Sequence, residues 1–188
     1  MPSFKKSLIR HIAASTVLLG AFAGMQAAAF AGAGHSGGHG GAATDIGMPG
    51  QLSDVRRTIR IVMEDNFFDQ EKIIVRAGET VRFMIENKGE FVHEFNIGTA
   101  AMHADHQKEM FMMMEHGALE ADKINMAMME MDMGNGMTMK HDDPNSVLLE
   151  PGQSAEVIWT FPKDTELEFA CNVPGHYESG MMGKIRLQ

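Results

Sequence analysis

The chain has 188 residues, a formal net charge of −9 at pH 7, and one cysteine beside 19 methionines and 9 histidines. This length suits one ordinary domain with extensions. The acidic balance argues against nucleic-acid binding, because a negative surface repels a phosphate backbone and attracts metal cations and basic partner proteins. A single cysteine excludes an internal disulfide, whereas thiolate, thioether and imidazole groups suit copper.

The first residues have the order of a secretory signal peptide. Lys5, Lys6 and Arg10 precede the apolar run IAASTVLLGAFAG, and Ala29-Phe30-Ala31 offers an A-x-A cleavage site. The run is well short of the about 20 residues that span a bilayer. We therefore predict a leader at residues 1–31 and export to the periplasm, with no stable membrane insertion after cleavage; the alternative is an anchor that is never removed. Cleavage removes three cations and no acids, which moves the charge from −9 to −12.

Residues 32–55 are rich in glycine and small side chains and have little to bury. This composition predicts a flexible arm. His35 and His39 lie within it, so copper capture near the mature N-terminus and an inert linker are both compatible with the arm.

From residue 56 the chain alternates between apolar and polar residues, which predicts half-buried strands. Val81, Phe83 and Ile85 alternate with Arg82, Met84 and Glu86, and Ala77-Gly78-Glu79 forms a turn before them. Other rows at period two are Ile59, Ile61, Met63; Phe91, His93, Phe95, Ile97; Val157, Trp159, Phe161; Leu167, Phe169, Cys171; and Ile185, Leu187. Such strands predict an all-β domain, an antiparallel sandwich or barrel, over residues 56–188.

Residues 99–145 interrupt the alternation. They begin with good helix formers and lose regularity near Met133, which predicts a helical insert that ends in a Met-rich loop.

The C-terminal loop carries a metal-ligand spacing. It reads CNVPGHYESGM from Cys171 to Met181, which is Cys-x4-His-x4-Met through His176. A blue-copper (type 1) site needs two histidines and a cysteine in a trigonal plane, with a weak axial methionine. His93 is the fourth candidate because it shares the inward face of its strand with apolar residues. Alone, His93 is also compatible with a hydrogen-bonded core histidine and Met181 with a gap-filling side chain, and Met182 is a rival axial ligand one residue too far along.

Three segments resemble the cupredoxin family, namely FVHEFNIG, PGQSAEVIWTF and FACNVPGHYESGMMGKI. The likeness covers residues 56–98 and 146–188 and is greatest to periplasmic cupredoxins linked to copper tolerance. It implies a Greek-key β-sandwich, one type 1 copper on His93, Cys171, His176 and Met181, and no bond-making chemistry. Many small cupredoxins have asparagine after the first ligand histidine, and Glu94 stands there in this chain.

The insert is the basis of a second hypothesis. Met102, His106 and Met110 are spaced at i, i+4 and i+8, so they would line one side of a helix. Imidazole and thioether groups bind copper in either oxidation state. We therefore expect a second copper site, with packing of the methionines against the sandwich as the alternative. Its candidate ligands are Met102, His103, His106, Met110, Met114 and His116.

These features favour a periplasmic copper-handling protein that cycles one copper between Cu(I) and Cu(II) as part of tolerance to the metal. The alternative is a soluble one-electron carrier with a redox protein partner. We do not expect an enzyme, because multicopper oxidases and nitrite reductases use His-x-His pairs and a binuclear copper centre needs two cysteines. The sequence has neither feature.

Overall fold

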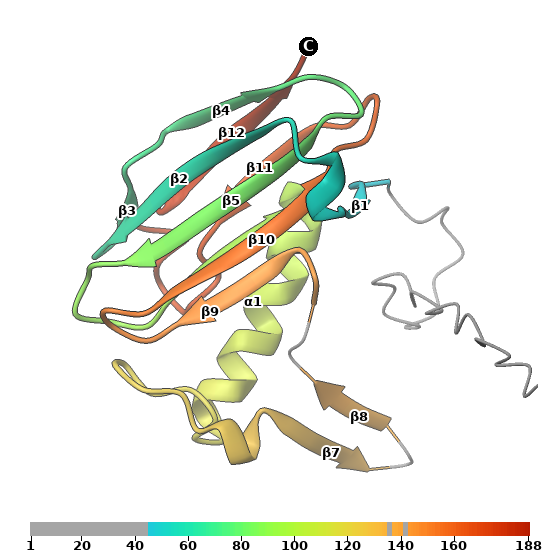
Figure 1. Cartoon of the computed structure of the whole chain (residues 1–188). Coiled ribbons are helices and arrows are strands. Elements are labelled where there is room, and N and C mark those ends of the chain that lie inside the picture. The colour runs from blue at the N-terminus through green and yellow to red at the C-terminus, as the bar shows by residue number, and fades with distance from the viewer. Residues whose placement is uncertain (1–44, 135–136, 141–142) are drawn as a thin grey trace, which may run out of the picture. The chain divides into compact units, whose positions relative to one another are not determined.

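The computed structural model of the chain describes residues 45–134, 137–140 and 143–188. The expected leader and most of the expected arm with His35 and His39 lie outside the described residues. So does His141, a histidine of the insert that is compatible both with the second copper site and with a surface turn. Two five-stranded sheets and one α-helix make up most of the described part (Figure 1). No helix among the described residues is long and apolar enough to cross a membrane.

The first sheet has the order β1-β10-β5-β2-β3 and the second the order β4-β12-β11-β6-β9. The strands of the first are β1 (Met48–Pro49), β2 (Arg57–Glu64), β3 (Phe67–Phe68), β5 (Thr80–Asn87) and β10 (Ser154–Thr160). The strands of the second are β4 (Lys72–Val75), β6 (His93–Gly98), β9 (Ser146–Leu149), β11 (Leu167–Ala170) and β12 (Met182–Leu187). Most neighbours are antiparallel, but β2 pairs with β5 and β4 with β12 in parallel. The predicted all-β Greek-key sandwich is confirmed, with two parallel pairs that the strand patterns did not predict.

The core lies between the sheets, where the predicted apolar rows meet. Phe83 and Phe95, from different sheets, are fully buried and lie 5.3 Å apart between ring centroids. Phe68 and Phe169 extend this aromatic cluster. Each fully buried apolar side chain contributes about 1.5 to 3 kcal/mol relative to exposure, so this cluster fixes how the sheets face each other.

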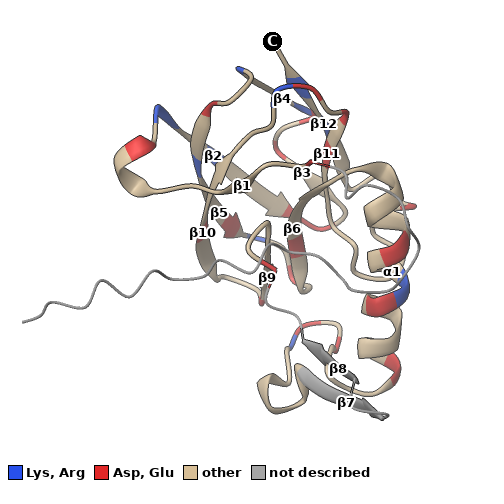
Figure 2. Cartoon of the chain, turned by 90° about the vertical axis from the view of Figure 1, so that its right-hand side faces the viewer, with Lys and Arg blue, Asp and Glu red and all other residues tan. Residues whose placement is uncertain are grey.

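Strands β6 and β11 differ from the predicted alternation because every residue in both is buried. Helix α1 (Ala100–Glu115) contacts both strands and covers their outer face (Figures 1 and 2). Glu94 and Asn96 are buried for this reason. Phe91, predicted to point inward, is 42% exposed because it precedes β6 in a loop; that assignment was wrong.

The insert is helical at its start, as predicted, but the helix is shorter. Thr99 caps α1 by accepting a hydrogen bond from the Met102 N–H, and the helix ends before Gly117, whose φ is +75°. A 3-10 turn (Met126–Met128) and a two-stranded hairpin of β7 (Glu130–Gly134) and β8 (Met137–Lys140) follow. The expected Met-rich loop is thus a hairpin. Its methionines recur at every second position within each strand, but methionine is so frequent in this segment that the alternation did not stand out.

Residues from the second half of the expected arm pair with the first sheet. Met48 pairs with Thr160 at the edge of β10, and the Trp159 indole N–H donates to the Ile46 carbonyl at 2.9 Å. Residues 46–49 therefore complete one edge of the first sheet.

Candidate metal centre

Three candidate ligands converge at one end of the sandwich. His93 opens β6, Cys171 directly follows β11, and His176 lies in the loop that leads to β12. Because β6 and β11 are antiparallel and Phe169 pairs with Ile97, the beginning of β6 and the end of β11 meet at the same end. The sheet register therefore brings His93 beside the loop that carries the other two.

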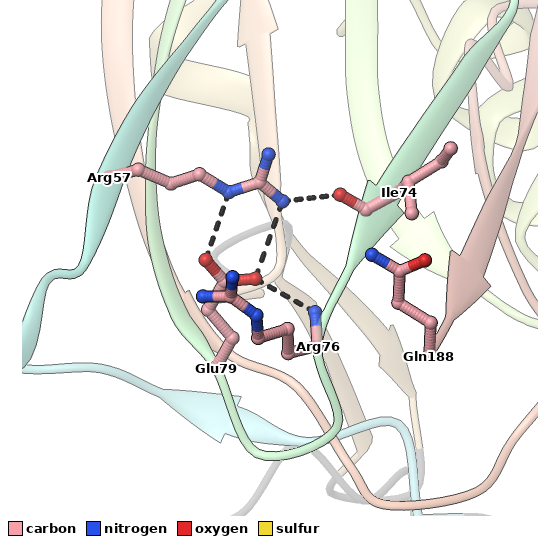
Figure 3. Close-up of a pocket in the computed structure, with 5 residues that line it drawn as sticks. All are labelled: Arg57, Ile74, Arg76, Glu79 and Gln188. Carbon is pink, nitrogen blue, oxygen red and sulfur yellow. Dashed lines mark hydrogen bonds and ion pairs between the residues drawn. The ribbon is translucent and has the colours of Figure 1, made fainter.

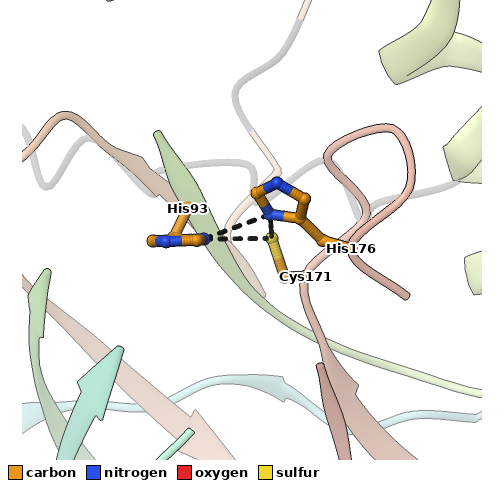
Figure 4. Close-up of side chains that lie close together, drawn as sticks. All are labelled: His93, Cys171 and His176. Atoms are coloured by element: carbon orange, nitrogen blue, oxygen red, sulfur yellow. Dashed lines mark hydrogen bonds between the residues drawn. The ribbon is translucent and has the colours of Figure 1, made fainter. Parts of the chain in front are cut away.

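The ligand atoms face one another (Figure 4). The Nδ1 atoms of His93 and His176 are 3.2 Å apart, and the Cys171 Sγ lies 3.4 Å from His176 Nδ1 and 3.9 Å from His93 Nδ1. Atoms bound to one ion at about 2.0 to 2.3 Å would lie roughly 3 to 4 Å apart. Two imidazole nitrogens and one sulfur at this spacing fit a copper ion.

The cluster is shielded from water except at one histidine. His93 and Cys171 have no exposed surface, and His176 is partly exposed. Within the described ranges, no other three His, Cys, Asp or Glu side chains bring their ligand atoms this close together.

Met181 closes the loop around this cluster. Its backbone N–H donates to the His176 carbonyl at 3.0 Å, and its carbonyl accepts from the Cys171 N–H at 3.1 Å. The Met181 side chain has no exposed surface, whereas Met182 is half-buried at the beginning of β12. Met181 therefore lies buried where the ligand loop closes, and its assignment as the fourth ligand, with Met182 as the rival, stays a prediction.

Burial determines the protonation of these groups in the metal-free protein. It raises the pKa of the Cys171 thiol to about 12. Burial, together with the nearby His93, lowers the pKa of His176 to about 4. Burial also lowers the pKa of His93, against the opposing effect of Asp65. Both imidazoles are therefore neutral, as ligation requires, and a bound cation would replace the thiol proton.

A protein-family comparison agrees with this geometry. The model of the copper-binding proteins of the plastocyanin/azurin family matches residues 58–188. The chain belongs to this family. Copper is therefore the metal of the cupredoxin site, and the recognition made from the three sequence segments is confirmed.

Two curated relatives share much of the chain. The copper-resistant cuproprotein CopI of Pseudomonas aeruginosa is 48% identical over 187 residues, which cover 95% of this chain and 97% of the relative. The protein of the same name from Rubrivivax gelatinosus is 39% identical over 82% of this chain and 81% of its own length. This cupredoxin is therefore similar to copper-resistance proteins over nearly its whole length.

Solved structures show the same fold. Auracyanin B matches with a TM-score of 0.53 and 18% identity, over 77% of this chain and 95% of its own. Reduced auracyanin from Roseiflexus castenholzii matches with a TM-score of 0.51 and 22% identity, over 71% of this chain and 98% of its own.

Asp65 is a site residue that the sequence analysis missed. It lies in the turn between β2 and β3, and its Oδ1 is 3.0 Å from His93 Nε2, the ring nitrogen that faces away from the sulfur. The same oxygen accepts the N–H groups of Glu90 and Phe91. Burial raises the pKa of Asp65, but these hydrogen bonds and the nearby His93 outweigh that effect and hold the pKa below its usual value. An ionised carboxylate thus orients the His93 ring, as is common for metal-bound histidines.

The candidates of the insert do not assemble as a second cluster of imidazoles. His106 is buried with its ring nitrogens 3.0 Å from Glu94 Oε1 and 3.0 Å from Glu109 Oε2. His103 is buried beside Asn172, and His116 is exposed. Met110 lies in the core, while Met102 and Met114 are half-buried. The second copper site, with packing of the methionines as its alternative, therefore stays a prediction.

A separate pocket lies at the opposite end of β2 from Asp65. Its lining consists of Arg57, Ile74, Arg76, Glu79 and Gln188 (Figure 3). Glu79 accepts from the Arg57 guanidinium at 2.9 Å and from the Arg76 N–H at 2.8 Å. These contacts describe a structural ion pair, and the lining has no cysteine, histidine or methionine to hold copper.

Proposed function

We propose that this cupredoxin holds one type 1 copper on His93, Cys171, His176 and Met181 and cycles it between Cu(I) and Cu(II) as part of tolerance to copper. The convergence of two imidazole nitrogens and a thiol sulfur within 3.9 Å carries the proposal. The names of the CopI relatives support the role in copper resistance.

The protein's residues would hold the ion and limit its rearrangement. Asp65 orients the His93 ring, and the Glu94 N–H donates to the Cys171 sulfur at 3.3 Å. The backbone bonds of Met181 hold the loop closed. When bound, copper supplies one-electron exchange between its two oxidation states. A ligand set that moves little between those states reduces the cost of the exchange.

The proposed location is the periplasm, after removal of residues 1–31. The basic, apolar and small-residue order of that segment supports export. Mass spectrometry of the protein recovered from periplasmic extracts tests this by its N-terminal residue, and an N-terminal Met1 in that fraction would contradict it.

Replacing Cys171 with serine tests the metal site. Cys171→Ser removes the soft thiolate, so we expect loss of the intense visible thiolate-to-copper absorption and of reversible redox cycling, measured on copper-loaded protein. Met182→Leu is the matched control and should keep both properties. A coloured, redox-active Cys171→Ser protein would contradict the proposal.

The partial exposure of His176 favours a second candidate, a soluble carrier that passes electrons through this ligand to a redox protein. A deletion strain separates the two functions. Sensitivity to added copper supports tolerance, whereas failed respiration or photosynthesis without copper stress supports electron carriage.

A further inference from the structure

Glu94 is a buried acid that lies beside two of the proposed copper ligands, His93 and Cys171. It directly follows His93 and has no exposed surface. Its backbone N–H donates to Cys171 Sγ at 3.3 Å. Its Oε2 accepts the backbone N–H of Asn172 at 3.2 Å and the Asn172 side-chain amide at 2.8 Å. Glu94 thus contacts both Cys171 and Asn172, the first through its backbone and the second through its carboxylate.

The other carboxylate oxygen of Glu94 faces helix α1. Oε1 accepts from the Ser146 hydroxyl at 2.6 Å and lies 3.0 Å from His106 Nε2. Glu109 Oε2 lies 3.0 Å from the opposite nitrogen of the same ring. An imidazole between two carboxylates donates from both nitrogens and is therefore cationic. The insert thus supplies a positive charge to a carboxylate next to the copper site.

A charge in this position affects the metal because little water screens it. His106 is 9% exposed and Glu94 is fully buried, so both act through a medium of low effective dielectric constant. A nearby negative charge stabilises Cu(II) over Cu(I), and a positive charge does the reverse. The two side chains should therefore have opposite effects on the reduction potential.

We propose that Glu94 and His106 are positioning residues through which helix α1 holds the Cys171–Asn172 corner and sets the reduction potential of the copper. This inference rests on the proposed type 1 site. The buried face of α1 would then tune the reduction potential of the copper at the type 1 site. His106 would have this role in place of binding a second copper.

The test uses three variants of the full chain loaded with copper: Glu94→Gln, His106→Gln and the double variant. Spectroelectrochemical titration measures the Cu(II) to Cu(I) ratio at a fixed potential. We expect Glu94→Gln to lower this ratio and His106→Gln to raise it, each by about tenfold, which equals about 59 mV for a one-electron couple. The double variant should lie between them, close to the wild-type protein. Asp105→Asn, an exposed charge on the same helix, is the matched control and should change the ratio little.

The metal-free protein provides an independent measurement. Urea unfolding of the same variants should give non-additive losses of stability, because His106→Gln removes the cation that faces Glu94 and Glu94→Gln removes one of the two carboxylates that face His106. Additive losses would contradict the direct pairing.

Failure of the inference is distinguishable from failure of the proposed function. Variants that keep the thiolate absorption but show unchanged potentials, or shifts of the same sign, would overturn the inference alone. Absence of that absorption from the wild-type protein would overturn the proposed function. If Glu94→Gln does not fold, the sign of the His106→Gln shift still decides, and a lowered or unchanged ratio would contradict the inference.

Discussion

At the scale of single residues, His93 is held on both sides. Its Nδ1 faces the sulfur of Cys171, while its Nε2 contacts the carboxylate of Asp65. Asp65 is itself fixed by two backbone N–H groups from the loop before β6. The ring has little freedom to turn, so its Nδ1 stays directed at the other candidate ligands.

Replacing Asp65 with asparagine should change the electrostatics of the site while keeping an oxygen acceptor. Loss of one negative charge next to a ligand disfavours Cu(II), so we expect Asp65→Asn to raise the reduction potential of the copper. Spectroelectrochemical titration measures the shift. Glu90→Gln removes the same charge from an exposed neighbour and is the control. Equal shifts in both variants would attribute the effect to net charge and contradict a specific role for Asp65.

At the scale of elements, α1 has a buried face that is partly polar. His103 and His106 lie on it together with Met110 and Met113. The apolar pair joins the core, while the histidines meet polar partners on β6 and in the loop after β11. The helix therefore adheres to the sandwich through an ion pair as well as through apolar contact.

The ion pair of α1 should make stability depend on pH. Burial alone would lower the pKa of His106, but Glu94 and Glu109 raise it from 6.5 to about 10. A side chain whose pKa is raised by folding stabilises the folded state fully when the pH lies below its pKa in the unfolded chain, here 6.5. This contribution declines as the pH rises toward 10. His106→Gln should therefore cost on the order of 3 kcal/mol at pH 6 and little at pH 10, measured by urea unfolding of the metal-free protein.

The groups that face His106 are Glu94 from β6 and Glu109 from its own helix, with His103 one turn away. His116→Gln, an exposed histidine just after α1, is the control and should leave the pH dependence of stability unchanged. A cost of His106→Gln that is constant from pH 6 to 10 would contradict a charged role.

At the scale of the whole molecule, the first described residues close one edge of the sandwich. Gly47 has a φ of +102°, and a side chain there would meet the Thr160 carbonyl oxygen at 2.2 Å. This close approach lets residues 46–49 pair with β10 and receive the hydrogen bond of Trp159. Residues 46–49 pair with the last residues of β10, which lie beside the beginning of β5. The copper site lies at the opposite end of the sandwich, beyond the end of β5.

Gly47→Ala should therefore destabilise the molecule without changing the metal centre. The clash and the backbone strain together should cost about 1 to 3 kcal/mol, measured by thermal unfolding, while the visible absorption of the copper-loaded protein stays constant. Gly78→Ala is the matched control, because Gly78 also has a positive φ but a side chain there meets no atom within 4 Å. A cost no larger than that of the control would show that the edge contact contributes nothing.

The ligand loop and the strand faces were predictable because their signals are local. Spacing alone placed Cys171, His176 and Met181 in one tight loop, and period-two alternation identified the buried rows around Phe83 and Trp159. His93 was found because a histidine on an apolar face needs a partner. These inferences depend on residues close together in the chain, so they did not require knowledge of the fold.

The remaining features depend on contacts between distant segments, which the sequence alone could not determine. Asp65 reaches His93 only because the turn after β2 lies beside the loop that precedes β6. Glu94 is buried only because α1 folds back across β6 and supplies His106. Glu94 stands where many small cupredoxins have asparagine, but its partner on α1 is not encoded in any local pattern. The amino-acid sequence thus determined which atoms can bind copper, and the tertiary structure decided which charges surround them, because electrostatic interactions depend on distance in space.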